Sequence, residues 1–337
     1  MKLLIVTQKV DRHDPILGFF HRWIEEFARQ CESVIVIGQK VGDHELPKNV
    51  TVLSLGKEKR MSRLRQVWRF HRYLWKYRSR YSAVLVHMTP IWVTLSLPCS
   101  LFLRKRWYLW YEARGERWPL KVALRLCRKI FSASDRGMPL ETKKSIITGH
   151  GIDTDVFSPG GGLRDSHKLI TVGRVTAAKQ LHVILAALAR LPRDYRLSIY
   201  GHAITAADHT LLRTLEKEHD MRPVEGRVEI GSVTHDEIVH RMRSAALFLH
   251  ASKTSLDKAL LEAMACGCLV VSCSEAARGI LPKECFATAE GMAERARALL
   301  GLSESEQDAL RNQLREIVVQ NHSLKRLVKR LLAEMTK

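Results

Sequence analysis

One acidic side chain stands alone on a predicted helix that is otherwise apolar. A polar loop that starts at Thr254 leads into this helix. The helix ends at Gly267, and Glu262 is its only carboxylate. Apolar runs over 245–250 and 268–272 flank this segment and predict a strand on each side. An ionised carboxylate has two acceptor oxygens and no donor, which suits the two hydroxyl groups of a ribose. The alternative is a glutamate that caps the helix or pairs with a neighbouring side chain.

Two cations follow another predicted strand, residues 169–172. Arg174 comes directly after Gly173, and Lys179 stands at the start of a helix predicted for 180–190. Two fixed cations together with the N–H groups of a helix N-terminus form a site for a diphosphate. Ordinary surface basicity is the alternative in a chain with 55 Lys and Arg.

Glycines stand at several places where a ligand could approach the backbone. Gly201 and Gly231 each end a predicted strand, and Gly18 opens a helix predicted for 18–29. A glycine allows a phosphate or a sugar to come close, although glycines are equally expected in turns. No G-x-G-x-x-G motif occurs, so the usual dinucleotide fingerprint is missing.

Strands and helices alternate along the chain and predict an α/β fold with parallel sheets covered on both faces. In the first half, strands are predicted for 3–7, 33–37, 50–55, 83–87, 108–111, 129–133 and 146–147, with helices over 18–29, 57–80 and 91–103. In the second half, strands are predicted for 169–172, 197–200, 228–230 and 247–250, with helices over 180–190, 206–220 and 236–243.

The domain boundary is predicted at a segment rich in Pro and Gly. Pro159 and the glycines 160–162 lie in a stretch with little apolar content. The expected domains are therefore 1–158 and 159–318, followed by a helix within 319–337 that could cross back to the first domain. Two doubly wound, Rossmann-like domains in tandem would face a cleft with the carboxyl ends of both sheets.

The composition limits the classes of protein to consider. A chain of 337 residues with 46% apolar content is long enough for two cores. The longest uncharged apolar run, 91–103, is too short to span a membrane. The first residues resemble a strand and not a signal peptide, so we expect a cytoplasmic protein. The seven cysteines lack zinc-knuckle spacing and are expected to be reduced core residues.

The formal net charge of +20 requires an acidic partner or surface, and it is concentrated in one segment. Residues 57–80 carry ten Lys or Arg and one acid, with Trp68 and Trp75 among apolar residues at helical spacing. This pattern predicts an amphipathic helix on an anionic membrane surface; a solvated basic face over the sheet is the alternative. Nucleic-acid binding is less favoured because no RNA- or DNA-binding motif is present.

Taken together, these motifs resemble those of the family 4 glycosyltransferases of the GT-B fold. The resemblance covers nearly the whole chain and rests on Gly149-His-Gly-Ile-Asp153, Val172-Gly-Arg174 with Lys179, and Leu261-Glu-Ala-Met-Ala-Cys-Gly267. It implies a retaining transfer from a nucleotide sugar, UDP- or GDP-linked, that needs no metal and no other cofactor. It also implies that Arg174 and Lys179 are catalytic at the diphosphate and that Glu262 binds the ribose, with Gly18, Gly173 and Gly201 on the donor side.

Donor-sugar recognition departs from the usual family pattern. The family often has a second Glu eight residues before the ribose ligand, and this chain has Thr254 there, whose hydroxyl can still bind a donor sugar but holds it less strongly than a carboxylate. Some members that build bacterial surface polysaccharides have a similar Ser-x-Asp-Lys loop. The resemblance therefore implies Asp257 as a sugar ligand and Lys258 as a third phosphate ligand, and a simple solvated pair is the alternative.

The acceptor or sugar side is less well defined. Many family members carry a His after a strand of the first domain, whereas this chain offers Glu112 or Arg114 after 108–111. His87, Asp11 and His13 are possible substitutes at the ends of other strands, although loop acids and histidines are usually only solvated.

The expected function is a glycosyltransferase that adds a sugar to a glycan acceptor, lipid-linked in our expectation, during bacterial surface polysaccharide synthesis. The protein would work as a peripheral protein on the inner face of the cell membrane. A catalytically weak or inactive accessory subunit with the same fold is the main alternative, because Thr254 replaces a Glu and the first domain lacks the His.

Overall fold

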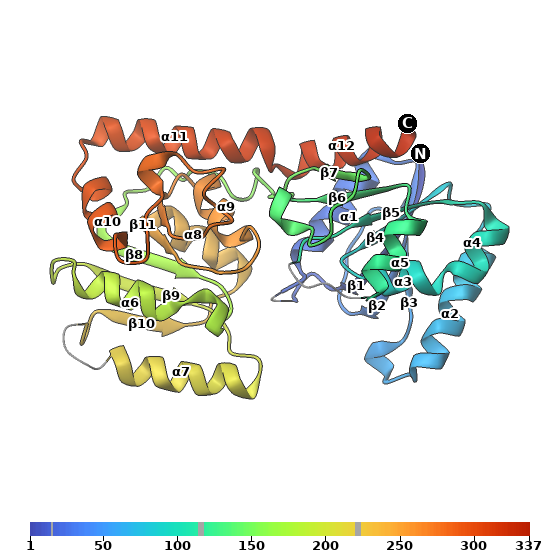
Figure 1. Cartoon of the computed structure of the whole chain (residues 1–337), viewed down its shortest axis with the longest axis horizontal. Helices are drawn as coiled ribbons and strands as arrows, with labels where there is room; N and C mark the ends of the chain where they lie inside the picture. The colour runs from blue at the N-terminus through green and yellow to red at the C-terminus, as the bar shows by residue number, and fades with distance from the viewer. Residues whose placement is uncertain (15, 114–117, 220–223) are drawn as a thin grey trace. The chain divides into compact units, whose positions relative to one another are not determined.

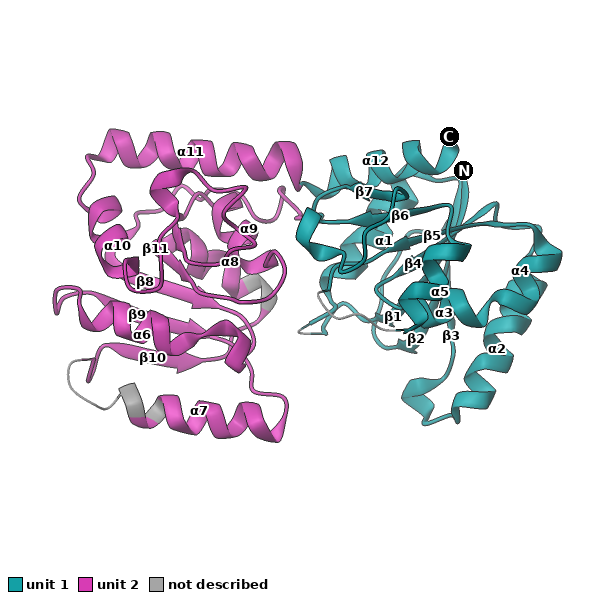
Figure 2. Ribbon diagram, in the orientation of Figure 1, with its two compact units in different colours: residues 1–151, 323–337 teal, residues 152–322 magenta. Residues whose placement is uncertain are grey.

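Two parallel sheets organise the chain, one in each of two units (Figures 1 and 2). The computed structural model describes residues 1–14, 16–113, 118–219 and 224–337. The first unit comprises 1–151 together with 323–337, and the second comprises 152–322. The prediction of two α/β domains with parallel sheets is confirmed.

The first unit has a seven-stranded sheet in the order β3-β2-β1-β4-β5-β6-β7. Its strands are β1 Lys2–Val10, β2 Ser33–Val41, β3 Val50–Ser54, β4 Ala83–His87, β5 Arg106–Trp110, β6 Lys129–Ser132 and β7 Ser145–Ile147. The strand order reverses between β1 and β4, so the topological switch point lies between these two strands. Loops after β1 and β4 are therefore the places where a ligand of this unit is expected.

Alternating residues of β1 build a core on each face of this sheet. Leu3 and Ile5 pack with α1 (Phe19–Gln30) and α12 (Leu324–Thr336), whereas Leu4 and Val6 pack with side chains of α2 (Arg63–Lys76). Both cores follow from the period of two along a strand. The second face also carries α3 (Pro90–Leu95) and α5 (Trp118–Leu126), with α4 (Leu97–Leu103) beside α2.

The last helix, α12, belongs to the first unit and packs against α1. It buries an apolar stripe made of Leu324, Leu327, Val328, Leu331 and Met335. Tyr108 of β5 donates its hydroxyl to the Met335 carbonyl at 2.9 Å, and Lys129 of β6 pairs with Glu334 at 2.7 Å. The tail is thus part of the core of the first unit, although it is far from it in sequence.

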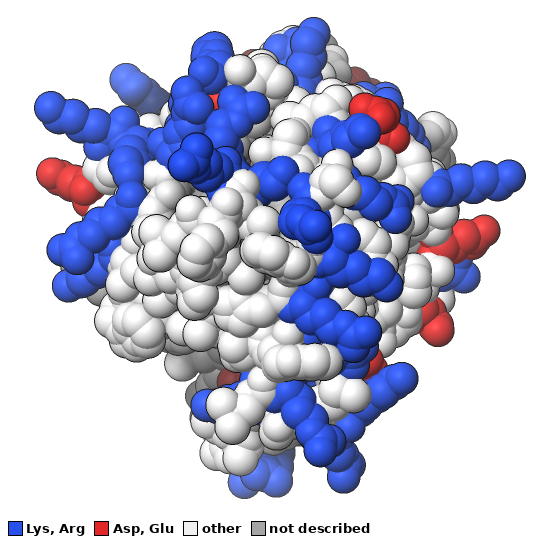
Figure 3. Space-filling model, turned by 90° about the vertical axis from the view of Figure 1, so that its right-hand side faces the viewer, with Lys and Arg blue, Asp and Glu red and all other residues white. Residues whose placement is uncertain are grey.

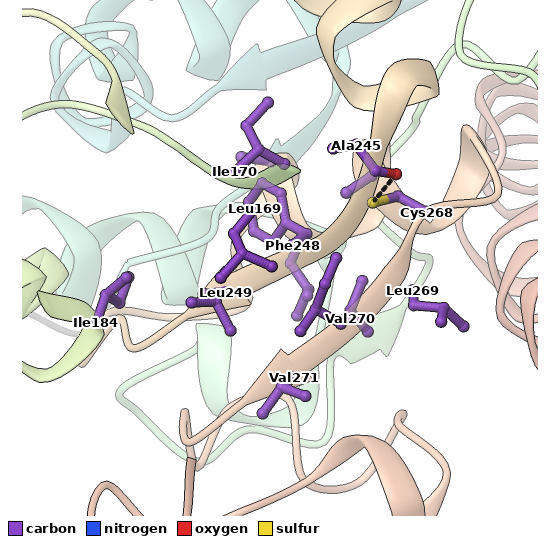
Figure 4. Packing of buried hydrophobic residues seen from close by; sticks show 14 of the residues in the cluster. Leu169, Ile170, Ile184, Ala245, Phe248, Leu249, Cys268, Leu269, Val270 and Val271 are labelled. Carbon is purple, nitrogen blue, oxygen red and sulfur yellow. Dashed lines mark hydrogen bonds between the residues drawn. The ribbon is translucent and has the colours of Figure 1, made fainter. Parts of the chain in front are cut away.

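The second unit has a five-stranded sheet in the order β10-β9-β8-β11-β12. Its elements are β8 Asp165–Val172, α6 Leu181–Ala189, β9 Arg196–Tyr200, α7 Ala206–His219, β10 Val228–Gly231, α8 His235–Ser244, β11 Ala245–His250, α9 Lys258–Ala265 and β12 Leu269–Ser272, followed by α10 Met292–Leu300 and α11 Glu304–Asn321. Figure 4 shows Leu169 of β8, Phe248 of β11 and Val270 of β12 packed in one apolar core. The order reverses between β8 and β11, which is the switch point of this sheet.

The two units divide at Gly151 and not at the predicted boundary of 158. Residues 153–158 look like the start of a linker in sequence, but two arginines of the second unit hold their backbone. Arg243 donates to the Ser158 carbonyl at 2.6 Å, and Arg315 donates to the Phe157 carbonyl at 3.2 Å. The Phe157 side chain is buried in the second core. The predicted boundary was late because apolar content alone does not show these backbone hydrogen bonds.

Some predicted helices differ from those in the structure. The basic segment 57–80 forms a 3₁₀ turn over Lys57–Lys59 and then α2, with Arg60 in a left-handed conformation between them. The predicted helix 91–103 is broken at Ser96, so that α4 begins next to Pro98. In the part of the chain that the structure describes, no helix is long and apolar enough to cross a membrane. All seven cysteines are free.

Candidate functional site

Glycines bring two strand ends of the second sheet into close contact. A Cβ atom on Gly201, after β9, would lie 1.9 Å from the carbonyl oxygen of Gly173, after β8, so no side chain fits there. Gly173 has a φ of +148°, and a Cβ on it would lie 2.8 Å from the Lys179 side chain. The Gly201 amide in turn donates to the Gly231 carbonyl after β10. Gly173 and Gly201 are therefore required by the close approach of the strand ends to each other and to Lys179.

Lys179 and Asp257 form an ion pair at the switch point between β8 and β11. Their side chains are only 17% and 12% exposed. Behind the pair, His250 at the end of β11 contacts Asp257 at 3.3 Å and the Ser272 hydroxyl, at the end of β12, at 2.8 Å. Burial raises the pKa of the Asp257 carboxyl, but the Lys179 ammonium and the His250 hydrogen bond outweigh it and hold this pKa well below its usual range. Asp257 therefore stays ionised.

Asp257 also caps α9, because its carboxylate accepts from the Ala259 amide at 3.3 Å. Lys258 and Glu262 follow on one face of this helix, one turn apart, and both are half-buried. Burial lowers the pKa of Lys258 to about 8, although the nearby Glu262 and Asp153 carboxylates favour its charged form. Glu262 thus lies one turn after Lys258, the first residue of α9. Its neighbours Leu261 and Ala263 are buried.

Arg174 is exposed and follows Gly173 at the same edge. The pKa of Asp208, near the start of α7, is lowered mainly by the hydrogen bond from the Thr205 amide. The charge of Arg174 also contributes to this lowering. The Lys253 amide donates to the Ala178 carbonyl at 2.8 Å and ties the loop after β11 to the loop after β8. Arg174 is therefore exposed to solvent at this edge, whereas Lys179 is paired with Asp257.

Thr254 uses its hydroxyl within its own loop. Its Oγ1 lies 2.8 Å from the Ser252 hydroxyl and donates to the Ser255 carbonyl at 3.1 Å. This arrangement shapes the loop 251–257 between β11 and α9. The Thr254 hydroxyl, predicted on the donor side, is thus engaged within its own loop.

In the first unit, His87 at the end of β4 is clamped between aromatic rings. Its ring stacks on Phe20 with centroids 4.1 Å apart and on Trp110 with centroids 5.3 Å apart. Its Nδ1 lies 3.4 Å from the Thr7 hydroxyl of β1, so His87 sits at the switch point of this sheet. The next residue, Met88, has a φ of +60°, a strained conformation for a side chain of this size. Such strain is found most often at functional sites.

Asp11 and His13, after β1, engage only local partners in the contacts that the structure gives. Asp11 pairs with Lys9 at 3.0 Å and accepts from the His13 amide at 3.1 Å. The exposed His13 ring accepts from Arg12 at 3.0 Å.

Gly18 has helical φ and ψ, and a Cβ on it would lie 2.6 Å from the Asp14 carbonyl oxygen. Gly18 is thus required by the packing of this loop.

Glu112 is buried and organises the loop after β6. Its two oxygens accept from the Ser132 hydroxyl, the Ala133 amide and the hydroxyl and amide of Ser134, at 2.8 to 3.2 Å. Burial raises its pKa, and these hydrogen bonds oppose the rise. A Cβ on Gly137 would overlap the carboxylate. These contacts favour a structural role for Glu112 over a sugar-binding one. Arg114, the other candidate in this loop, lies outside the described residues.

The sequence analysis missed two residues of the second unit that lie at the candidate site. His250 ends β11 and links Asp257 to Ser272, and Asp153 lies near Lys258. A signal existed for His250, because it is the last residue of a strand whose carboxyl end reaches the switch point. Asp153 ends the motif 149–153, but the sequence gives no sign that it approaches a lysine on α9.

The edge of the second sheet can bind an anionic ligand. Helices α6 and α9 begin there, and their N-terminal N–H groups attract negative charge. Lys258 and Arg174 add cations, Lys179 adds one that is already paired with Asp257, and Glu262 adds an acceptor for hydroxyl groups. Among the described residues, no group of three His, Cys, Asp or Glu side chains could hold a metal ion.

Residues 166–304 match the family model described as "Glycosyl transferases group 1". The matched region lies within the second unit and contains Arg174, Lys179 and Glu262. No curated relative matches the sequence.

The whole chain is similar in fold to several solved structures. HepE from Anabaena, in complex with UDP and glucose, has 16% identity and a TM-score of 0.77, with 100% of both chains covered. Sucrose-phosphate synthase from Thermosynechococcus elongatus has 15% identity and a TM-score of 0.77, with coverage of 99% of this chain and 98% of that one. A glycosyltransferase from Rickettsia africae has 15% identity and a TM-score of 0.75, with the same coverage. These likenesses confirm the GT-B fold.

Proposed function

For a chain that has the GT-B fold and whose second unit matches the group 1 glycosyltransferases, we propose the transfer of a sugar from a UDP- or GDP-linked donor to a glycan acceptor. One observation carries the proposal. At the switch point of the second sheet, Arg174 and Lys179 lie in the loop that leads from β8 to α6, and Lys258 and Glu262 lie in the first two turns of α9, which follows β11. A nucleoside diphosphate needs both features, an acceptor for its ribose hydroxyls and positive charge for its phosphates.

Each donor group has a partner in this proposal. Glu262 accepts from the ribose hydroxyls, and Lys258, one turn earlier on α9, binds a phosphate oxygen. Arg174, which is exposed, binds the diphosphate from the solvent side. HepE was solved with UDP-glucose, and its fold extends over 99% of this chain, which supports a donor of this type.

The cations also favour the reaction itself. When the bond between the sugar and the diphosphate breaks, negative charge accumulates on the leaving phosphate. Arg174 and Lys179 would stabilise that charge more in the transition state than in the ground state, which lowers the barrier. Lys179 is already oriented by Asp257, so it need not reorganise during the reaction. Retention at the anomeric carbon and independence from metal are proposed from the family resemblance alone.

The first unit is proposed to bind the acceptor. The strained Met88 stands at the carboxyl edge of its sheet, where a ligand is expected, and the buried His87 before it, held between two rings, would position this edge and not itself contact the acceptor. A lipid-linked glycan of a bacterial surface polysaccharide is the proposed acceptor. The basic helix α2 would then hold the protein at the cytoplasmic face of an anionic membrane.

An accessory subunit that binds a nucleotide without catalysis is the second candidate. It is favoured by Thr254, whose hydroxyl is used within its own loop, and by Asp257, which neutralises Lys179. Tight nucleotide binding without turnover on any donor would support this reading.

The test combines binding and hydrolysis. We expect one of UDP, GDP, ADP and CMP to raise the melting temperature of the protein, since a ligand of the folded state stabilises it. Glu262→Ala should lower that affinity roughly 10- to 100-fold, as for a hydrogen bond to a charged group. It should also slow hydrolysis of the matching nucleotide sugar. Glu284→Ala, which removes an exposed acid of the same unit, is the matched control. Unchanged binding and hydrolysis in Glu262→Ala would refute the proposed donor site.

A further inference from the structure

Four polar side chains form a buried chain of contacts at the carboxyl edge of the second sheet. The Ser272 hydroxyl, at the end of β12, lies 2.8 Å from Nδ1 of His250, at the end of β11. Nε2 of His250 lies 3.3 Å from the Asp257 carboxylate, which also pairs with the Lys179 ammonium. Ser272 is fully buried and His250 is 3% exposed. The chain of contacts therefore leads from the interior of the second unit to Lys179, a proposed ligand of the diphosphate.

Burial distinguishes these side chains from most charged groups of the protein. Figure 3 shows one face of the molecule, on which many Lys and Arg side chains reach into solvent. Water and salt screen such charges, whereas the pair of Lys179 and Asp257 is largely buried. Lys179 nevertheless reaches the strand end, since a Cβ atom on Gly173 would lie 2.8 Å from its Nζ. A diphosphate bound at this strand end would therefore act on the buried chain through Lys179.

The hydrogen bonds around His250 accommodate both forms of its ring. Asp257 is ionised and has no hydrogen to donate, so Nε2 carries the hydrogen that lies between them. In the neutral ring Nδ1 accepts from the Ser272 hydroxyl, whose oxygen accepts from the Ser274 amide at 3.1 Å. In the charged ring Nδ1–H donates to the same oxygen, because a hydroxyl has two lone pairs. His250 can therefore gain a proton without losing a hydrogen bond.

Few other titratable groups of the described residues lie near His250. The groups come from three places: Lys179 before α6, Asp257 before α9, and Cys273 after β12 with Lys253 and Glu290 close to it. The Cys273 amide donates to the His250 carbonyl, and burial raises the pKa of the Cys273 thiol, which therefore stays neutral. The charge that His250 meets directly is that of Asp257, and the charge of Lys179 acts on it through Asp257.

A bound diphosphate would change the charge around Asp257. An ammonium has three donors, so Lys179 can bind a phosphate oxygen while it keeps Asp257. Its single positive charge is then shared between two anionic groups. Burial raises the pKa of Asp257, and the Lys179 ammonium is the main cause that opposes this rise. Sharing the ammonium thus leaves part of a buried negative charge unbalanced, which is unfavourable unless another cation forms beside it.

A proton from solvent could supply this charge at His250 or at Asp257. In unstructured peptides an imidazole takes up a proton near pH 6.5 and an aspartate near pH 3.9. Asp257 also accepts from the Ala259 amide at 3.3 Å, and this hydrogen bond favours the ionised carboxylate. Because His250 keeps its hydrogen bonds on protonation, it is the group that responds close to neutral pH.

We propose that His250 is a positioning residue of the donor site that takes up a proton from solvent when a nucleotide sugar binds. The imidazolium then holds Asp257, and with it Lys179, while Lys179 contacts the diphosphate. As the bond to the sugar breaks, negative charge grows on the leaving phosphate, and the added positive charge behind Lys179 favours that state. This inference deepens the proposed function and rests on it in one respect, that Lys179 binds the diphosphate of the donor.

The first experiment counts the protons that are taken up on binding. UDP-glucose and GDP-mannose are titrated calorimetrically into the full chain near pH 7, in PIPES and in Tris, which differ in ionisation enthalpy. The diphosphate of these probes is esterified at both ends, so it lacks the terminal phosphate that titrates at about pH 6. We expect the wild type to take up roughly half a proton or more per donor. His250→Gln keeps a donor to Asp257 but cannot become charged, so it should take up only a small fraction of that.

Two variants separate His250 from other titratable groups. His240→Gln is the matched control, because it removes an exposed histidine of α8 in the same unit, and its proton uptake should equal that of the wild type. Lys258→Arg removes the lysine whose charge changes near pH 8, since a guanidinium stays charged, and most of the uptake should remain. The inference is overturned if the wild type takes up no proton, if His250→Gln takes up as much, or if Lys258→Arg abolishes the uptake.

A second experiment needs no ligand. Lys179→Met removes the ammonium permanently and keeps the length of the side chain, so His250 should be charged near pH 7 in this variant and neutral in the wild type. Nitrogen chemical shifts of isotopically labelled histidines report the protonation of each ring. The His250 signal is the one that disappears when His250→Gln is added to Lys179→Met. A neutral His250 in Lys179→Met would also overturn the inference.

Donor hydrolysis is measured on the same preparations and separates this inference from the proposed function. If a donor is bound and hydrolysed without proton uptake, the role of His250 fails and the proposed function stands. If neither probe is bound or hydrolysed but His250 is charged in Lys179→Met, the proposed donor site fails and the link between Lys179 and His250 stands.

Discussion

Lys258 is a cation whose charge changes close to neutral pH. It lies at the first turn of α9, near Glu262 and Asp153, and burial lowers its pKa to about 8. Below that pH the ammonium form predominates and can attract a phosphate. Above it the neutral amine loses this attraction, and a diphosphate has one cation fewer to bind.

We therefore predict that the affinity for the nucleoside diphosphate falls as the pH rises from 7 to 9, by up to roughly tenfold for the loss of one charge-assisted contact. Isothermal titration calorimetry over this range measures it directly. Lys258→Arg is the control, because a guanidinium keeps its charge at these pH values. The same pH dependence in Lys258→Arg would show that another group is responsible.

At the residue scale, the sequence indicated the types of residues at the candidate site but not their pairing. Glu262 and Lys179 were recognisable because each stands alone at the start or on the face of a predicted helix. The pairing of Lys179 with Asp257 joins two loops that are far apart in sequence, and it depends on β8 and β11 being neighbours. Glu112 looked like a solvated loop acid, and only the fold shows that the backbone of Ala133 and Ser134 surrounds it.

At the scale of an element, α9 depends on a single side chain for its start. One oxygen of Asp257 accepts from the Ala259 amide, and the other pairs with Lys179 and His250. The two contacts can be separated by substitution. Asparagine keeps an acceptor for the helix cap but carries no charge, and alanine loses both.

We predict that Asp257→Asn lowers the free energy of unfolding by about 2–3 kcal/mol, because it leaves a largely buried Lys179 without its partner. Asp257→Ala should cost about 1 kcal/mol more through the lost cap. Urea denaturation of the full chain measures both changes. Asp165→Asn, which breaks an exposed pair with Arg196 at 3.7 Å, should change stability by less than about 1 kcal/mol.

The same variants have a pH signature. The pKa of Asp257 is lower in the fold than its unfolded value of about 3.9, so its contribution is present above that pH. It is lost as the pH falls further toward the folded value. Asp257→Asn should therefore lose less stability than the wild type between about pH 4 and pH 2. An Asn variant with the stability of the wild type at pH 7 would contradict the role of the ion pair.

Elements with a strong apolar period were predictable, and one interruption was missed. The strand 83–87 and the helix α1 follow directly from their patterns. The helix predicted for 91–103 ran through Pro98, although a proline favours the interruption that the structure has at Ser96. Helices α10 and α11 were missed, although Ser303 and Glu306 form a capping box at the start of α11. That box is a signal that the sequence contains.

At the scale of the whole molecule, the first unit is assembled from two separate stretches and the second from one. The chain leaves the first unit after Gly151 and returns to it at Ser323. The two connecting segments lie side by side, since the Ile152 amide donates to the His322 carbonyl at 2.7 Å. Only 323–337 can cover the apolar face of α1 that α12 occupies. The sequence analysis allowed for a returning tail but could not show which helix it covers.

We predict that residues 152–322 fold alone and that residues 1–151 do not. Without α12, the first fragment would leave part of the core around Trp23 and Phe27 uncovered, and it should aggregate or lack a cooperative thermal transition. Circular dichroism during heating measures this for each fragment. A fusion of 1–151 to 323–337 through a short Gly/Ser linker should restore the transition, because the two ends lie close together. A cooperative transition in 1–151 alone, at the temperature of the fusion, would contradict the prediction.

The returning helix also sets an order of events during protein synthesis. Residues 323–337 leave the ribosome only after the entire second unit has been made, which takes on the order of 10 s or more at roughly 5–20 residues per second. The second unit can close during that time, while the first waits with an uncovered apolar face that chaperones could bind. A stop codon a few residues before the end would therefore damage the part of the protein that was translated first.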